Sequence, residues 1–150
     1  MTYTLLWIED DPNDILLGER ALRKSGFPAP IVLRDGEEAI SYLSGKGAYD
    51  DRVRYPFPSL VLSDLKLPRV SGFDVLRWMR DQDGIRRIPA IILTSSRQRR
   101  DIDTAYDCGA SAYLVKPIET HVLVDLFRSL HSFWAMHNTG PELNLRAASR

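Results

Sequence analysis

Short apolar runs alternate along the chain with longer segments whose apolar residues recur every three or four positions. The runs show no polar alternation, which is typical of strands that are buried on both faces. They cover residues 5–8, 31–33, 60–62, 90–93 and 113–115. Five strands that alternate with five helices predict an α/β fold, in which helices cover both faces of a parallel sheet.

Residues with strong capping preferences mark where several helices begin or end. Asp11 precedes Pro12 and is expected to cap the first helix, with Asp14 as a further solvated acidic residue at its start. Residues 35–38 resemble a capping box, and Gly109 is expected to end the helix after the fourth strand. Residues 44–58 are rich in turn formers and predict a long loop.

Apolar residues at helical spacing predict which side chains face the core. They are Leu17, Ala21 and Leu22; Ala39, Ile40 and Leu43; Phe73, Leu76 and Met79; Ile102, Ala105 and Tyr106; and Leu123, Leu126, Leu130 and Phe133. Val122, Phe127 and Trp134 add apolar surface on neighbouring faces of the last helix. If part of this surface is exposed, we expect a homodimer through helix 4, strand 5 and helix 5.

Composition places the chain among ordinary globular domains. Its 150 residues predict one domain over 1–138, followed by a short flexible tail over 139–150. Twenty basic residues balance twenty acidic ones, which argues against binding to nucleic acid or to an anionic membrane. One cysteine, no signal-peptide pattern and no apolar stretch of about 20 residues indicate a cytoplasmic protein without a membrane span.

Polar residues follow the strands at one end of the predicted sheet. Glu9 and Asp10 follow the first strand, Asp64 ends the third, Thr94 the fourth and Lys116 the fifth. Ligands bind at the carboxyl ends of the strands in open α/β sheets. With the flavodoxin-like doubly wound strand order 2-1-3-4-5, the three carboxylates are expected around one hole, with a hydroxyl and an ammonium nearby.

Three carboxylates in one place require a cation or a proton between them. Hard oxygen ligands suit Mg²⁺ better than zinc, and the three histidines all lie on the last helix. With a divalent ion bound, one carboxylate is free to attack phosphorus and form an acyl phosphate. Lys116 would then supply positive charge to the phosphoryl oxygens and Thr94 a hydrogen-bond donor.

An ordered set of motifs resembles the response regulator receiver family. The set comprises Glu9-Asp10-Asp11, Asp64 with Leu67-Pro68 and Gly72, Thr94-Ser95, and Tyr113-Leu114-Val115-Lys116-Pro117. The match runs in order across roughly residues 4–135 with the spacing of five βα units. The resemblance implies a phosphoacceptor switch in two-component signalling rather than an enzyme with turnover.

The resemblance also implies roles for the acidic residues. Asp64 would be the phosphorylation site and Asp10 a direct Mg²⁺ ligand. Glu9 would act on the metal through water, and the backbone carbonyl of Lys66 would be a further ligand. Mn²⁺ is expected to substitute for Mg²⁺.

Further roles are implied at the ends of the fourth and fifth strands. Lys116 would pair with Asp64 or its phosphate and precede Pro117 through a cis peptide bond. Thr94 and Tyr113 would form the switch pair. The threonine hydroxyl would move toward the phosphate while the tyrosine ring rotates inward, which changes the face made by helix 4, strand 5 and helix 5.

A narrower resemblance is to small receivers paired with phytochrome-type histidine kinases. It rests on residues 9–14, on the long loop before the third strand, on residues 105–110 and on Phe133-Trp134. It implies a sensor histidine kinase as partner. Nothing after residue 138 is long enough for a DNA-binding output domain, so a stand-alone regulator that signals through protein contacts is expected. Trp7 departs from the family because it is bulky for a first strand.

Three other functions fit the sequence less well. A phosphohydrolase with Asp64 as nucleophile would need a second acid two residues later, but Lys66 stands there. A flavodoxin-like FMN carrier is disfavoured because the acidic loop after the first strand would repel the FMN phosphate. A receiver-like scaffold that is never phosphorylated would not need the complete acidic set.

Overall fold

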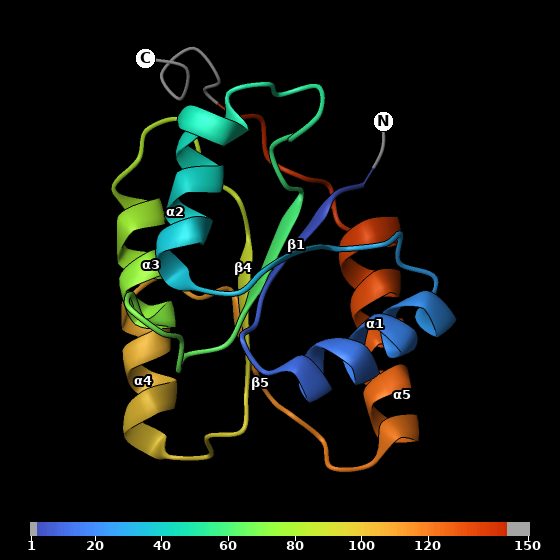
Figure 1. Ribbon diagram of the computed structural model, residues 1–150. Helices are drawn as coiled ribbons and strands as arrows, with labels where there is room; N and C mark the ends of the chain where they lie inside the picture. The colour runs from blue at the N-terminus through green and yellow to red at the C-terminus, as the bar shows by residue number, and fades with distance from the viewer. Residues whose placement is uncertain (1–2, 144–150) are drawn as a thin grey trace.

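The structure, a computed structural model, describes residues 3–143, which form a five-stranded sheet with helices on both faces (Figure 1). The strands are β1 (Leu5–Ile8), β2 (Ile31–Leu33), β3 (Leu60–Ser63), β4 (Ala90–Thr94) and β5 (Ala112–Val115). Neighbouring strands are parallel, and their order is β2-β1-β3-β4-β5. The flavodoxin-like fold and its strand order are therefore confirmed.

Helices follow the strands in turn and divide between the two faces of the sheet. They are α1 (Pro12–Ser25), α2 (Gly36–Ser44), α3 (Gly72–Arg80), α4 (Arg99–Asp107) and α5 (Thr120–Leu130). A short 3₁₀ turn, η1 (Gly47–Tyr49), follows α2, and a π-helical segment, η2 (His131–His137), continues α5. The helices α1 and α5 cover one face, and α2, α3 and α4 cover the other (Figure 1).

The capping predictions agree with the structure. The Asp11 carboxylate accepts hydrogen bonds from the backbone N–H groups of Asn13 and Asp14, which otherwise have no partner in the first turn of α1. Asp35 accepts from the N–H of Glu38 at the start of α2. After α4, Gly109 adopts φ 101°, a left-handed conformation that glycine tolerates best.

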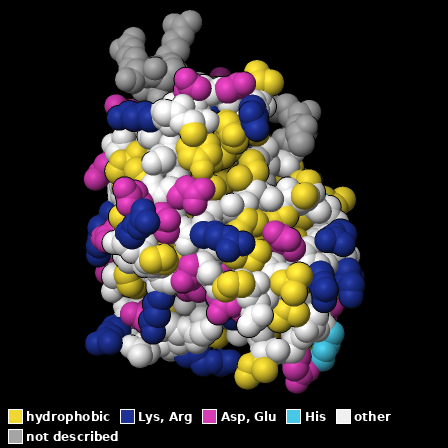
Figure 2. Space-filling model, viewed as in Figure 1, with side chains coloured by type: hydrophobic (Ala, Val, Ile, Leu, Met, Phe, Trp, Pro, Cys, Tyr) yellow, Lys and Arg dark blue, Asp and Glu magenta, His cyan; other side chains and the backbone are white. Residues whose placement is uncertain are grey.

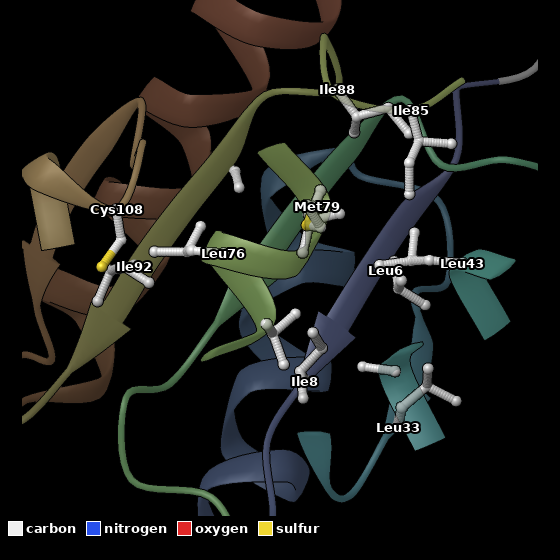
Figure 3. Close-up of a cluster of buried hydrophobic side chains, with 14 of the residues drawn as sticks. Leu6, Ile8, Leu33, Leu43, Leu76, Met79, Ile85, Ile88, Ile92 and Cys108 are labelled. Carbon is white, nitrogen blue, oxygen red and sulfur yellow. The ribbon is translucent and has the colours of Figure 1, made fainter. Parts of the chain in front are cut away.

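The larger hydrophobic core lies between the sheet and the helices α2, α3 and α4. Leu6 and Ile8 of β1 belong to this core together with Leu76 and Met79 of α3 (Figure 3). All four side chains are buried. The uninterrupted apolar strands thus bury residues on both faces, because the alternate residues Leu5 and Trp7 belong to the second core under α1 and α5.

Trp7 fits in the first strand because a glycine lies opposite it. The indole is 1% exposed, and a Cβ atom on Gly18 of α1 would lie 2.2 Å from its Cη2 atom. The Nε1 atom of Trp7 is the one buried side-chain polar atom without a hydrogen-bond partner in residues 3–143. Only a residue without a side chain lets α1 approach the sheet at this point.

Three of the residues expected in the core are substantially exposed. Leu17 is 41% exposed, Tyr106 is 48% and Phe133 is 56%, whereas Phe127, expected on a neighbouring face, is fully buried. Phe133 lies in η2, where its carbonyl accepts from the N–H of Asn138 five residues later. This wider spacing turns the helix and shifts residues beyond Leu130 away from the α-helical stripe.

The long loop before β3 is fastened by Arg52. Its guanidinium donates to the carbonyls of Tyr42 and Leu43, at the end of α2, and to that of Tyr55. It also lies 4.2 Å from the centroid of the Phe57 ring. The side chain therefore holds residues 44–58 against the carboxyl end of α2 and gives the last carbonyls of the helix a side-chain donor.

The expected tail begins in an extended segment that contacts the domain. Arg87 donates to the carbonyl of Glu142, and Leu143 packs beside the larger core. The remainder of the expected tail, residues 144–150, lies outside the described residues. Within residues 3–143, no helix is long and apolar enough to span a bilayer. Figure 2 shows acidic and basic side chains interspersed on one face, in keeping with the balanced charge.

Candidate functional site

Backbone hydrogen bonds just past the strand ends bring the site residues to one edge of the sheet. The N–H of Glu9 donates to the carbonyl of Leu33, which ends β2. The N–H of Asp64 donates to the carbonyl of Ile8, and that of Lys116 to the carbonyl of Thr94. Each site residue therefore extends the sheet ladder by one bond, which fixes its Cα position before any side chain interacts.

Lys116 is the centre of the site. Its Nζ lies 2.7 Å from Glu9 Oε2, 2.7 Å from Asp64 Oδ2 and 2.9 Å from Asp14 Oδ2. The side chains of Glu9 and Asp64 are only 1% and 11% exposed, and that of Lys116 is 14% exposed. Each of the three N–H bonds of the ammonium thus has one carboxylate acceptor.

The second oxygens of the two buried carboxylates accept from backbone N–H groups. Glu9 Oε1 accepts from the N–H groups of Asp10 and Asp11, both at 3.1 Å. Asp64 Oδ1 accepts from Leu65 at 2.6 Å and from Lys66 at 3.4 Å. These bonds hold both carboxylates in fixed orientations and leave one oxygen of each directed at Lys116.

Burial and charge act in opposite directions on the ionisable groups of the site. Burial raises the pKa of Glu9 above its usual value, although the hydrogen bond from Lys116 partly opposes this rise. Burial alone would lower the pKa of Lys116, but its hydrogen bonds to Asp14, Asp64 and Glu9 outweigh that effect and raise it. Three carboxylates share one ammonium, so the lysine holds its proton tightly while Glu9, the most buried carboxylate, remains under-compensated.

The carboxylates that meet at Lys116 differ from the three that were expected around a metal ion. Asp10 is exposed, and Asp14 takes the third place beside Glu9 and Asp64. Within residues 3–143, no three acidic, histidine or cysteine side chains are placed to hold a metal ion. Instead, the Lys116 ammonium lies between the two buried carboxylates, 2.7 Å from each. The donor set itself, carboxylate oxygens beside the exposed Asp10, still fits a hard cation such as Mg²⁺.

Gly72 explains one of the motif glycines. A Cβ atom at this residue would lie 2.1 Å from the carbonyl oxygen of Asp64 and 2.9 Å from the Cα of Leu65. The N–H of Gly72 donates to the carbonyl of Leu65 at 2.9 Å. The start of α3 therefore packs directly against the backbone that carries Asp64.

Thr94 and Tyr113 meet at Ser96, a residue that no sequence motif identifies. Thr94 is buried, and its Oγ1 accepts from the N–H of Ser96 at 3.5 Å. The Tyr113 hydroxyl donates to the carbonyl of the same serine at 2.9 Å. Ser96 and Asp14 have no recognisable sequence signal, since each depends on a partner that only the fold brings near.

The peptide bond between Lys116 and Pro117 is trans, so the prediction of a cis bond is wrong. Residues 3–143 contain no cis peptide bond. The trans form is favoured for X–Pro bonds by about 0.5–1 kcal/mol unless surrounding contacts select the other isomer. Ile118, which follows Pro117, is 99% exposed and supplies no such contact.

A parallel α/β sheet with buried carboxylates and a lysine at its carboxyl edge defines a class of signalling domain. The family model for the response regulator receiver domain matches residues 5–128, and the chain belongs to this family. Receiver domains bind Mg²⁺ as their cofactor.

Several known response regulators are similar to the chain in sequence and structure. Response regulator Rcp1 of Synechocystis sp. is 32% identical over 131 residues, which cover 87% of each protein. A structure of phosphorylated RcpA, a cyanobacterial phytochrome response regulator, has 31% identity and a TM-score of 0.87, covering 95% of this chain and 100% of RcpA. Response regulator RPA3017, described in red light signalling of R. palustris, has 33% identity and a TM-score of 0.88, with 93% and 99% coverage. The chain is therefore similar to phytochrome response regulators.

Proposed function

We propose that the chain is a phosphorylation switch that accepts a phosphoryl group on Asp64 from a sensor histidine kinase. The observation that carries the proposal is the buried Asp64 carboxylate, fixed by two backbone N–H groups and paired at 2.7 Å with Lys116. One carboxylate oxygen attacks phosphorus, the bond from phosphorus to the histidine nitrogen breaks, and an acyl phosphate forms. Lys116 then pairs with a phosphoryl oxygen in place of the carboxylate oxygen.

The proposed metal set comprises Asp10, Asp64 and the Lys66 carbonyl, with Glu9 acting through water. Mg²⁺, when bound, neutralises charge on the phosphoryl oxygens. The exposed Asp10 and the ladder position of Asp64 support this assignment, since both lie at the carboxyl ends of adjacent strands. Mn²⁺ is expected to substitute, in line with the Mn²⁺-bound structure of Rcp1.

Mass spectrometry of the intact protein tests this proposal. After incubation with acetyl phosphate and Mg²⁺, the wild type should gain one phosphoryl group, and the gain should vanish without Mg²⁺ or in Asp64→Asn. Asp35→Asn is the matched control, because Asp35 caps α2 near the same sheet edge and asparagine caps equally well. If the wild type gains nothing under any condition, the better account is a receiver-shaped scaffold.

The kinase is proposed to be of the phytochrome type. This rests on the likeness to RcpA, whose structure is described as a phytochrome response regulator. A purified phytochrome kinase, labelled on its histidine, should transfer phosphate to this chain faster than an unrelated sensor kinase does. Equal rates from both kinases would remove the phytochrome assignment and leave Asp64 as the acceptor.

Output is proposed to pass through protein contacts on α4, β5 and α5, including a homodimer. Tyr106 of α4, Val122 of α5 and Phe133 of η2, which continues α5, are exposed apolar side chains of this region. Thr94 and Tyr113 are proposed as the switch pair that couples this surface to Asp64. Sizing of the phosphorylated and unphosphorylated chain should reveal a change in the dimer fraction.

A further inference from the structure

The carboxylate of Asp14 is a third partner of the site lysine. Asp14 Oδ2 lies 2.9 Å from Lys116 Nζ, nearly as close as the oxygens of Glu9 and Asp64. Its side chain is 40% exposed, whereas those of Glu9 and Asp64 are almost fully buried. Asp14 therefore covers the ammonium on the solvent side, while the other two carboxylates hold it from within.

Helix capping does not account for this contact. Asp11 already accepts from the first free N–H groups of α1, including that of Asp14 itself. A negative charge in the first turn also favours a helix, but this effect does not require the carboxylate to point in any particular direction. The side chain of Asp14 instead meets a lysine that is 102 residues away in the sequence.

In the proposed function, the other two partners of Lys116 also interact with the metal ion. Glu9 Oε2 and Asp64 Oδ2 both face the ammonium at 2.7 Å. A divalent cation that draws on these carboxylates would repel the ammonium and compete for the same oxygens. Among residues 3–143, Asp14 is the one carboxylate partner of Lys116 that lies outside the proposed metal set.

We propose that Asp14 is a positioning residue that holds Lys116 when the metal ion takes over Glu9 and Asp64. The inference rests on the proposed function and deepens it. Asp14 gives the displaced ammonium a charged acceptor next to Asp64, so metal binding does not leave Lys116 without a partner. The lysine stays within reach of an incoming phosphoryl group instead of moving into solvent.

Mg²⁺ titration of the full chain, followed by the backbone amide NMR shifts of the site residues, tests the proposal. Asp14→Asn should weaken Mg²⁺ binding roughly fivefold, because a partly exposed charged partner is lost. The matched control is Asp11→Asn, which removes a charge from the same helix start but preserves its cap. The control should stay within about 1.5-fold of the wild type.

A double-mutant cycle separates positioning from a simple loss of negative charge. In a Lys116→Met background, Asp14→Asn should weaken Mg²⁺ binding no more than the Asp11→Asn control does. A fivefold loss that persists without the lysine would show that Asp14 acts on the metal directly, which overturns the positioning role. Equal weakening by Asp11→Asn and Asp14→Asn would overturn it as well.

The same data distinguish this inference from the proposed function. If wild type neither binds Mg²⁺ nor accepts a phosphoryl group, the proposed function fails and the role of Asp14 fails with it. If wild type does both and Asp14→Asn binds Mg²⁺ as tightly as wild type, only the role of Asp14 is overturned.

Discussion

Replacing Lys116 with methionine should destabilise the protein in a way that depends on pH. Methionine has a similar unbranched length but no charge, so Glu9 loses its counter-ion while it stays fully buried. Removing one partner of a buried ion pair costs about 3–5 kcal/mol, because the remaining charge is left in a poorly solvated place. The cost applies only while Glu9 is ionised.

The sign of the pH effect follows from the pKa of Glu9. Burial raises this pKa in the folded protein even with Lys116 present, and loss of the ammonium should raise it further. A carboxyl whose folded pKa exceeds its unfolded pKa contributes stability that is present below the unfolded value and lost as pH rises through the folded value. The destabilisation by Lys116→Met should therefore be small, about 1 kcal/mol, at pH 5 and approach about 3–5 kcal/mol at pH 8.

Urea unfolding at pH 5, 6, 7 and 8, in the presence of a chelator, measures this difference. Lys66→Met is the matched control, because Lys66 is also close to Asp64 in sequence but is exposed. It should change the free energy of unfolding by less than about 0.5 kcal/mol at every pH. An equal loss at pH 5 and pH 8 in Lys116→Met would refute the idea that the ammonium compensates a buried, ionised Glu9.

Three other predictions concern packing, the long loop and the dimer. Gly18→Ala places a methyl group against the Trp7 ring and should destabilise the protein by about 1–2 kcal/mol in thermal unfolding, despite the better helix propensity of alanine. Adding Trp7→Phe should recover part of this lost stability, and no recovery would contradict the clash. Arg52→Met removes three hydrogen bonds to carbonyls and should speed amide exchange across residues 46–57 without altering phosphorylation. The control is Arg54→Met, which should leave exchange nearly unchanged because the Arg54 guanidinium lies over the ring of Tyr55. Phe133→Asp places a charge on the exposed apolar surface of η2 and should shift the proposed dimer toward monomer in sedimentation. An unchanged dimer fraction would show that Phe133 is not part of the interface.

Strand positions were predictable because an uninterrupted apolar run followed by a polar residue has few other readings. The same pattern placed Glu9, Asp64 and Lys116 at one sheet edge, since carboxyl ends of parallel strands meet there. The structure places these three residues at that edge, and a backbone hydrogen bond to the neighbouring strand holds each of them there.

The buried faces of the helices were less predictable. Apolar residues every three or four positions define a broad arc of the helix surface but do not show which part of this arc faces the core. Leu17 and Tyr106 lie at the rim of that arc and are exposed, whereas Phe127 lies at its centre. The exposure of Phe133 was not predictable, because no sequence pattern indicates that α5 continues as a π-helix. The sequence predicts Asp14 only as a residue of the helix start, because its contact with Lys116 depends on a lysine from the far end of the chain.

Ser96 gives the proposed switch pair a physical connection that neither residue alone provides. Its N–H donates to Thr94, its carbonyl accepts from Tyr113, and its hydroxyl donates to Asp101 in the first turn of α4. One residue thus joins β4, β5 and α4. The contact to Thr94 is the longest of these bonds, at 3.5 Å, and is the least costly to break. We therefore expect that, if the Thr94 hydroxyl turns toward a phosphoryl group on Asp64, the Ser96 N–H is released first and the anchor of Tyr113 and the start of α4 shift with it.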